Sequence, residues 1–167
     1  MIKRLDFQND SQQLHEGSCC PNLMREIIIY KKGLDIPESD LIDLCHCSKE
    51  NGTSVKEMVA LADNFGLKYY LNYNSSISDL IYSINKKNPI LILIQEGQNY
   101  KSKDWSKIWD KGHYVGINGF DEQKKEIFYY DPLYGKTKAI SYQNLNKVWH
   151  DKDLESVYEH FGMFFLD

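Results

Sequence analysis

The sequence has no long apolar run and no apolar segment near its first residue. Its longest strongly apolar stretch, PILILI at residues 89–94, is far shorter than the roughly 20 residues that a membrane-spanning helix needs. The opening stretch MIKRLDFQNDSQQ contains no apolar core of a secretory signal. We therefore expect a cytoplasmic protein with no membrane span and no classical export signal, and non-classical export stays open.

Basic charge and cysteine are also scarce. The chain has 20 Lys and Arg residues scattered among 24 Asp and Glu residues, for a formal net charge of -4. Because phosphate binding needs clustered basic side chains, we expect no nucleic-acid partner. The four cysteines are too few for a disulfide scaffold in a chain of 167 residues, so we expect free thiols.

The chain shows no internal repeat and no low-complexity segment, and its length is typical of a single domain over residues 1–167. The clearest early element follows Cys20, where apolar residues recur at helical spacing up to Gly33. Pro21 fits only the first turn of a helix, so this helix should begin close to Cys19.

The remaining pattern predicts a helical first half and a second half rich in strands. Helices are expected over residues 39–47, 54–66, 78–86 and 141–149. Strands are expected over residues 67–72, 89–94, 113–120, 126–131, 136–140 and 160–167. A polar turn, DEQKK, joins two of these strands into an antiparallel hairpin, and the fold class is α+β.

Two adjacent cysteines stand where the first helix begins. The apolar stripe assigns Cys20 to the core face, so Cys19, one residue earlier, should point elsewhere and be exposed. A thiol at a helix N-terminus lies at the positive end of the helix dipole, which favours the thiolate. Cys19 is therefore a candidate nucleophile, although both cysteines can equally be read as small buried apolar residues.

A cysteine nucleophile needs a base and a group that orients the base. His113 opens a strongly patterned strand, and Asp131 ends the return strand of the same hairpin. With a symmetric turn, Asp131 would lie opposite Gly116 and not His113, so a contact between the two requires an offset register or a β-bulge. A histidine in a strand and an Asp-Pro turn are also ordinary structural features.

Taken in order, these motifs resemble family thirty-nine of the cysteine peptidases, the bacteriocin-processing peptidases and their stand-alone relatives, within the papain-like superfamily. The family typically shows a Gln, then CGP opening a helix, GT, GL, an apolar strand after Pro, GHYV with GYD, DP and a closing Trp. This chain offers Gln13, CCP, NGTSVKEM, FGLKYY, NPILILI, GHYVGINGFD, YYDPLYG and VWHD. The resemblance spans residues 10 to 166.

The resemblance implies a papain-like fold and a role for each of four residues. Cys19 becomes the nucleophile, His113 the general base and Asp131 the residue that orients the imidazole. Gln13 would donate a hydrogen bond to the oxyanion, beside the backbone N–H of Cys19. Cys20 departs from the family, which usually has Gly there.

The sequence thus predicts a cysteine peptidase, a hydrolase that cleaves a peptide or protein substrate and uses no metal or organic cofactor. One alternative is a catalytically silent peptide-binding module, since some relatives lack the cysteine. Another is a papain-like deamidase or acyltransferase that forms the same thioester. Relatives fused to transporters cut after a double glycine, but this chain has no membrane span, so that specificity is not carried over.

Two further groups of residues have alternative interpretations. Cys45, His46 and Cys47 could join a nearby Cys or His as a zinc site, but a C-x-C pair lacks the usual spacing, and Cys45 also continues a core stripe. Trp105 and Trp109 precede His113 in a polar stretch. They could form a wall for the substrate or close a long loop as apolar plugs.

Overall fold

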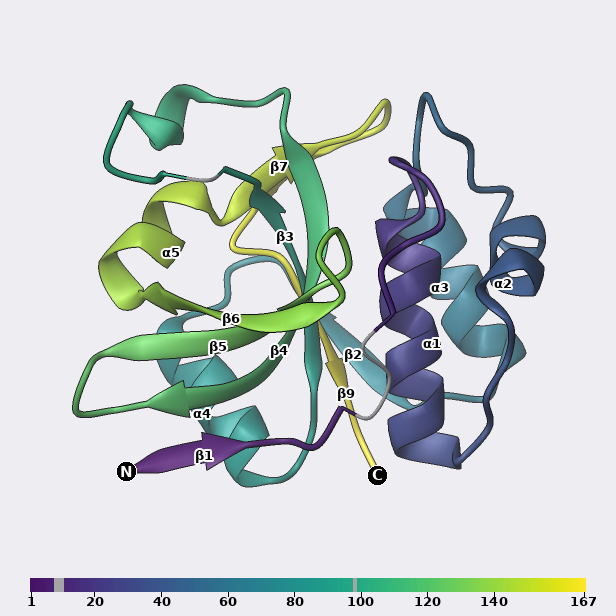
Figure 1. Ribbon diagram of the computed structural model, residues 1–167, viewed down its shortest axis with the longest axis horizontal. Coiled ribbons are helices and arrows are strands. Elements are labelled where there is room, and N and C mark those ends of the chain that lie inside the picture. The colour runs from purple at the N-terminus through teal and green to yellow at the C-terminus, as the bar shows by residue number, and fades with distance from the viewer. Residues whose placement is uncertain (8–10, 98) are drawn as a thin grey trace.

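A computed structural model describes residues 1–7, 11–97 and 99–167 of the chain. An antiparallel sheet separates two groups of helices (Figure 1). Helices α1 (Cys19–Lys32), α2 (Glu38–Leu44) and α3 (Val55–Asn64) cover one face. Helices α4 (Ile77–Asn85) and α5 (Tyr142–Val148) pack against the other face. The fold is therefore the expected α+β arrangement.

Within the described residues, seven strands form one sheet in the order β2-β9-β3-β4-β5-β6, and β1 pairs with the far half of β4. The strands are β1 (Ile2–Arg4), β2 (Tyr69–Asn72), β3 (Ile90–Gln95), β4 (Gly112–Asp121), β5 (Glu126–Asp131), β6 (Lys136–Ser141) and β9 (Gly162–Phe165). A separate hairpin consists of β7 (His150–Lys152) and β8 (Val157–Glu159). A short 3-10 helix, η1, spans Trp105–Lys107.

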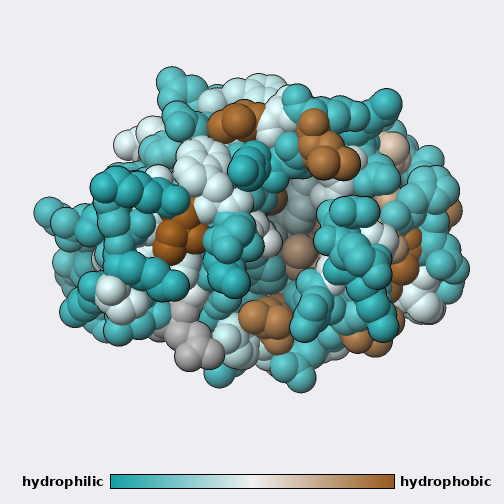
Figure 2. All heavy atoms as spheres, turned by 90° about the horizontal axis from the view of Figure 1, so that it is seen from above, coloured by the Kyte–Doolittle hydropathy of each residue, from teal (hydrophilic) through white to brown (hydrophobic). Residues whose placement is uncertain are grey.

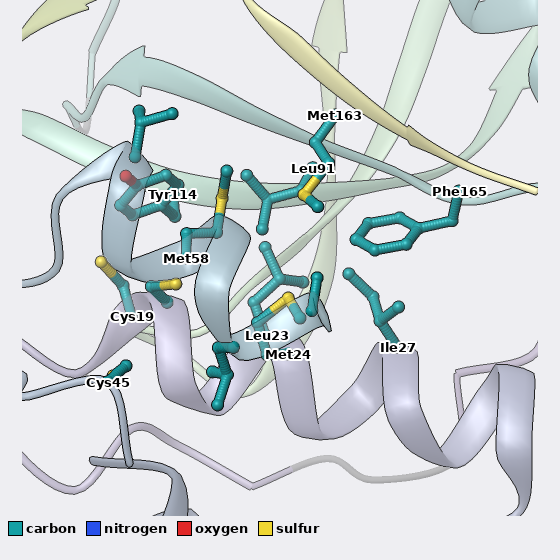
Figure 3. Packing of buried hydrophobic residues seen from close by; sticks show 14 of the residues in the cluster. Cys19, Leu23, Met24, Ile27, Cys45, Met58, Leu91, Tyr114, Met163 and Phe165 are labelled. Atoms are coloured by element: carbon teal, nitrogen blue, oxygen red, sulfur yellow. The ribbon is translucent and has the colours of Figure 1, made fainter. Parts of the chain in front are cut away.

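Helix α1 is the central element of the larger core. Its apolar stripe, including Leu23, Met24 and Ile27, packs against α3 and against strands of the sheet (Figure 3). Its close packing on β4 depends on Gly116, where a Cβ atom would lie 2.5 Å from Leu23 Cδ1. The absence of a side chain at that position lets helix and strand approach closely, which fixes where the N-terminus of α1 lies.

Local signals explain the ends of the best-defined helices. Helix α1 begins at Cys19 with Pro21 in its first turn, and Gly33 ends it in the left-handed conformation with φ of 66°. Helix α3 begins with a capping box in which Ser54 and Glu57 each accept from the other's backbone N–H. Both starting points agree with the sequence prediction.

Four elements were not expected from the sequence, and each is only three residues long: β1, β7, β8 and η1. Such short elements carry too few residues for a periodic pattern. None of the helices in the described part of the chain has the length and apolar character required to cross a membrane.

Candidate active site

A cleft of about 830 Å³ opens where the N-terminal end of α1 meets the start of β4. Figure 2 looks onto this end of the molecule and shows a hollow near the middle of the face, surrounded mainly by hydrophilic residues. Cys19 and His113 both line the cleft. The loop before α3 and the β7–β8 hairpin complete its walls.

The walls of the cleft are acidic. Its charged residues other than histidine are Glu16, Glu50, Glu57, Asp151, Asp153 and Glu155 against Lys49 and Lys152. This excess of carboxylates gives a negative potential in a concave, partly enclosed space, where field lines concentrate. A cationic segment therefore enters this cleft more readily than an anionic one.

Cys19 is the first residue of α1, and its thiol lies at the edge of the core that faces the cleft. The side chain is only 8% exposed, so the expectation of an exposed thiol was wrong. Cys19 points away from the deepest core, as Figure 3 shows, but α3 and Tyr114 pack around it. Cys19 is one of the residues that line the cleft.

Cys20 is fully buried, as the apolar stripe predicted. Burial raises the pKa of this thiol well above its usual value, and the nearby Cys19 and Cys47 act in the same direction. Cys20 is therefore a neutral core residue at neutral pH. Of the two adjacent thiols, only Cys19 borders the cleft.

His113 and Asp131 are in direct contact inside the protein. The imidazole Nε2 donates to Asp131 Oδ1 at 2.7 Å, and the two residues are 6% and 1% exposed. Because Nε2 is taken by the carboxylate, Nδ1 is the ring nitrogen left for Cys19, whose thiol interacts with the imidazole. The backbone N–H of Leu133 also donates to Asp131 Oδ1 at 3.0 Å, which fixes the carboxylate.

A β-bulge in the hairpin makes this contact possible. The register of β4 and β5 shifts between Ile117 and Gly119, so that Gly116 pairs with Tyr130 and not with Asp131. Because successive side chains of a strand point to opposite faces, a shift of one residue moves Asp131 to the face of His113. The structure thus contains the irregularity that the contact required.

The protonation state of His113 depends on two opposing effects. Burial lowers the pKa of the imidazole, but the hydrogen bond to Asp131 and the interaction with Cys19 outweigh it and raise the pKa to about 10. Burial raises the pKa of Asp131, but His113 and Lys138 together hold it below its usual value. An imidazolium beside Cys19 is therefore stable over the whole neutral range.

The Asp151 carboxylate packs closely against the backbone next to His113. A Cβ atom on Gly112 would lie 2.2 Å from Asp151 Oδ2, so only glycine allows the carboxylate to approach this closely. The Gln95 side chain donates to Asp151 Oδ1 at 3.0 Å and accepts from the backbone N–H of Lys111 at 2.9 Å. These contacts fix the start of β4, from which His113 projects.

Gln13 lies beside the loop that leads into Cys19, but it does not line the cleft. Its side-chain Nε2 donates to the carbonyl oxygens of His15 at 2.7 Å and Glu16 at 3.0 Å. Its backbone N–H donates to Pro132 O at 2.9 Å, next to Asp131. Gln13 thus connects the loop before Cys19 to the turn after Asp131, and an oxyanion would have to replace one of its two carbonyl acceptors.

The other cysteines form part of the core around α1. Cys45 is buried, and the Cys47 thiol donates to Gly17 O at 3.1 Å. A hydrogen bond from Cys45 lowers the pKa of Cys47 to about 7, against the opposing effect of burial. The part of the chain that the structure describes holds no group of three or more His, Cys, Asp or Glu residues arranged for a metal ion.

The two tryptophans before His113 do not line the cleft. Trp105 is buried against Gly97 and the core on the α4 and α5 side of the sheet. Trp109 packs on the ring of His150 at a centroid distance of 4.4 Å. Of the two interpretations, the geometry favours apolar plugs that close the loop.

Two residues near the His113–Asp131 pair were not expected from the sequence. Lys138 Nζ donates to Asp131 Oδ2 at 3.0 Å, and Asp151 lies against the backbone of Gly112. In the register of β5 and β6, Asp131 pairs with Lys136 and Lys138 pairs with Tyr129. Even a correct register would therefore have placed Lys136 opposite Asp131 and Lys138 only at the diagonal position on the same face. Asp151 lies in a three-residue strand, for which the sequence gives no comparable signal.

Comparison with known proteins gives a family and a fold. The sequence model of the Peptidase_C39 like family matches residues 7–162. No curated protein matches the chain. Among solved structures, a C39-like peptidase from Bacillus anthracis is similar with a TM-score of 0.69 and 12% identity, over 100% of this chain and 98% of that one.

Two further structures come from transporters. The peptidase domain of Streptococcus ComA, a bi-functional ABC transporter of a quorum sensing pathway, has a TM-score of 0.67 and 15% identity, over 96% of this chain and 98% of that one. A double glycine motif protease from an AMS/PCAT transporter, in complex with its leader peptide, has a TM-score of 0.63 and 15% identity, with both chains fully covered. At these identities the likeness shows the fold.

Proposed function

The chain belongs to the Peptidase_C39 like family, and from this premise we propose that it is a cysteine peptidase whose nucleophile is Cys19. His113 is the general base and Asp131 orients it. One observation carries the proposal: a buried His–Asp pair with a 2.7 Å hydrogen bond lies beside a thiol at a helix N-terminus, and the thiol opens onto a cleft.

The reaction begins from the ion pair in which Nδ1 of His113 holds the proton of the Cys19 thiol, so that a thiolate lies beside an imidazolium. The thiolate sulfur attacks the carbonyl carbon of the substrate, and the carbonyl π electrons move to the oxygen. When the tetrahedral intermediate collapses, the C–N bond breaks and the imidazolium gives its proton to the leaving amine. A thioester remains on Cys19.

Water then cleaves the thioester. Neutral His113 accepts a proton from the water, whose oxygen attacks the thioester carbon, and the C–S bond breaks to release a carboxylic acid and the Cys19 sulfur. Throughout, Asp131 accepts from Nε2 and keeps Nδ1 directed at the sulfur. The carboxylate stays charged, because its pKa is held low.

The oxyanion is stabilised at the N-terminus of α1. The first backbone N–H groups of a helix have no intrahelical acceptor. In α1 the i to i−4 hydrogen bonds begin with the N–H of Asn22, which donates to Ser18 O at 3.1 Å. The N–H of Cys19 is therefore available beside the sulfur. Gln13 adds a side-chain donor when its amide exchanges the carbonyl of His15 or Glu16 for the oxyanion.

The substrate is a peptide or a peptide segment of a protein. The double glycine motif protease with the same fold holds a leader peptide. In this chain the acidic walls of the cleft favour a substrate with Lys or Arg near the scissile bond over one with Asp or Glu.

Site-resolved alkylation tests the proposal without a known substrate. We expect iodoacetamide to modify Cys19 rapidly at pH 7, and His113→Ala to slow this modification at least tenfold. Cys47 is the matched internal control, because its thiol has a pKa of about 7 and does not depend on His113. Mass spectrometry of the modified peptides measures both thiols in one sample.

A peptide library incubated with the protein and with Cys19→Ala then tests hydrolysis. Cleavage by the unchanged protein alone supports a peptidase. Rapid alkylation without cleavage, but with loss of ammonia from glutamine or transfer of an acyl group to an amine, would assign a deamidase or an acyltransferase instead. If Cys19 is modified no faster than a free thiol and no peptide is cut, the chain is a peptide-binding module and the proposal is wrong.

A further inference from the structure

We propose that Lys138 is a positioning residue of this site, which holds Asp131 in place and sets the pH range in which Cys19 and His113 react. This inference rests on the proposed function, because it concerns the same pair. It assigns to a strand residue outside the cleft a role in the chemistry inside it.

The contact between Lys138 and Asp131 is direct. Lys138 Nζ donates to Asp131 Oδ2 at 3.0 Å, while Oδ1 of the same carboxylate accepts from His113. The carboxylate is 1% exposed, and the Lys138 side chain is 27% exposed. One carboxylate therefore bridges an imidazole and an ammonium group, and the solvent screens the three charges only weakly.

The surroundings fix the ammonium group as well. It lies over the ring of Tyr134 at 4.3 Å and near the ring of Tyr129 at 5.8 Å. Tyr134 belongs to the turn between β5 and β6, where its N–H donates to Asp131 O at 3.1 Å. Aromatic rings attract an ammonium group. These contacts hold Lys138 against Oδ2, the carboxylate oxygen that His113 does not contact.

The other titratable groups around the pair do not replace Lys138. Those that face it are the Cys19 thiol from α1 and the phenols of Tyr100 and Tyr129. Burial raises the pKa of both phenols above the usual value, so both are neutral at neutral pH. Among these described neighbours, Lys138 is the cation that balances Asp131.

The charge of Lys138 has a definite effect on the reactive pair. A positive charge next to Asp131 weakens the field that the carboxylate exerts on His113, so it makes the imidazole less basic. It also favours the thiolate of Cys19. Removing this charge should therefore raise the pKa at which the imidazolium loses its proton, and the alkylation profile of Cys19 should move to higher pH.

The test is the rate at which iodoacetate alkylates Cys19 between pH 4 and pH 11 for the full chain and three variants. Because this reagent is an anion, its rate rises as the thiolate forms and falls as the imidazolium loses its proton. Lys138→Met keeps most of the side-chain volume and removes the charge. We expect both limbs of its profile to move to higher pH by about half a unit to one unit. Lys138→Arg keeps a charged donor and should restore the original profile.

Lys136→Met is the matched control. Lys136 lies two residues earlier on the same strand and is exposed, and its ammonium group contacts the ring of Tyr134 at 5.8 Å. Among the described residues, that ammonium group forms no ion pair with Asp131, whereas the one of Lys138 does. The profile of Lys136→Met should therefore not move. Thermal unfolding of each variant separates a loss of stability from a change in the pH profile.

The outcomes are distinguishable. The inference is supported if the pH profile shifts in Lys138→Met but stays unchanged in both Lys138→Arg and Lys136→Met. An unchanged profile in Lys138→Met, with or without lower thermal stability, overturns it and leaves the proposed peptidase intact, as does an equal shift in Lys136→Met. Slow, pH-independent alkylation of Cys19 in the unchanged protein would instead contradict the proposed function.

Discussion

The substitution Asp131→Asn tests the interaction on which the proposed chemistry depends. It keeps the size of the side chain and removes its charge. The amide can offer only one acceptor oxygen, whereas the carboxylate accepts from His113 and Leu133 through Oδ1 and from Lys138 through Oδ2. The variant therefore places an N–H₂ group against either the imidazole or the ammonium group.

The size of the effect follows from the pKa of His113. That pKa is about 10 with the carboxylate present, and removing an opposite charge at hydrogen-bond distance lowers a pKa by roughly 1 to 3 units. The imidazolium of the variant should thus lose its proton between roughly pH 7 and pH 9. With iodoacetate, an anion that the imidazolium attracts, we expect Cys19 alkylation at pH 9 to fall about tenfold or more, and at pH 6 much less.

The same change predicts the pH dependence of stability. A raised pKa of His113 stabilises the folded state fully below the usual value of 6.5, and this contribution disappears as the pH rises through about 10. The lowered pKa of Asp131 stabilises the folded state above its usual value of 3.8. The loss of thermal stability in Asp131→Asn should therefore be largest between about pH 4 and pH 6.5.

The assay is the rate of iodoacetate modification of Cys19 from pH 4 to pH 11, with unfolding temperature measured over the same range. Asp121→Asn is the control, because Asp121 is also buried and accepts from backbone N–H groups, but it lies at the other end of β4. If the basic limb of the Asp131→Asn profile stays at pH 10, the carboxylate is only a turn residue and the reasoning fails.

Three further substitutions test the rest of the site. Gln13→Ala should lower kcat for a cleaved peptide about 10²-fold to 10³-fold, while Cys19 alkylation is preserved. The control Gln12→Ala loses a hydrogen bond to Leu133 O and should change kcat little. Equal effects of the two substitutions on kcat would remove Gln13 from the oxyanion site. Gly112→Ala should displace Asp151 and the start of β4 and slow Cys19 alkylation at least tenfold, and an unchanged rate would show that this contact is unimportant. Cys20→Ala should leave the alkylation rate of Cys19 within about twofold. In urea unfolding it should lower the free energy of unfolding by roughly 1 kcal/mol, because it leaves a small cavity. Loss of Cys19 labelling would reverse the assignment of the two thiols.

Local sequence signals were sufficient to predict the helices whose ends carry characteristic capping residues. Pro21 and Gly33 mark the two ends of α1, and Ser54 with Glu57 marks the start of α3. These signals work because they satisfy backbone groups within a few residues of themselves, whatever the rest of the chain does. The order of motifs from Gln13 to the closing Trp149 likewise indicated the family, because that order can be read directly along the chain.

The burial of Cys19 could not be predicted from the sequence. The helical stripe correctly placed Cys20 in the core, but Cys19 is also buried, because α3 and β4 pack around the end of α1. A stripe describes one helix in isolation, whereas exposure depends on every element that packs against that helix. Gln13 shows the same limit, since its donors are taken by carbonyl groups of its own loop.

The contact between His113 and Asp131 was decided by tertiary structure. Strand β4 is buried on both faces beyond its first residue, so its sequence has no alternation of apolar and polar residues that would mark which side chains share a face. The bulge at Asn118 then changes the pairing by one residue, which brings Asp131 to the side of His113. The sequence by itself determined which residue types are present and in what order. Their register across the sheet, and with it the place of Lys138 beside Asp131, came only from strand pairing, because pairing depends on residues far apart in the chain.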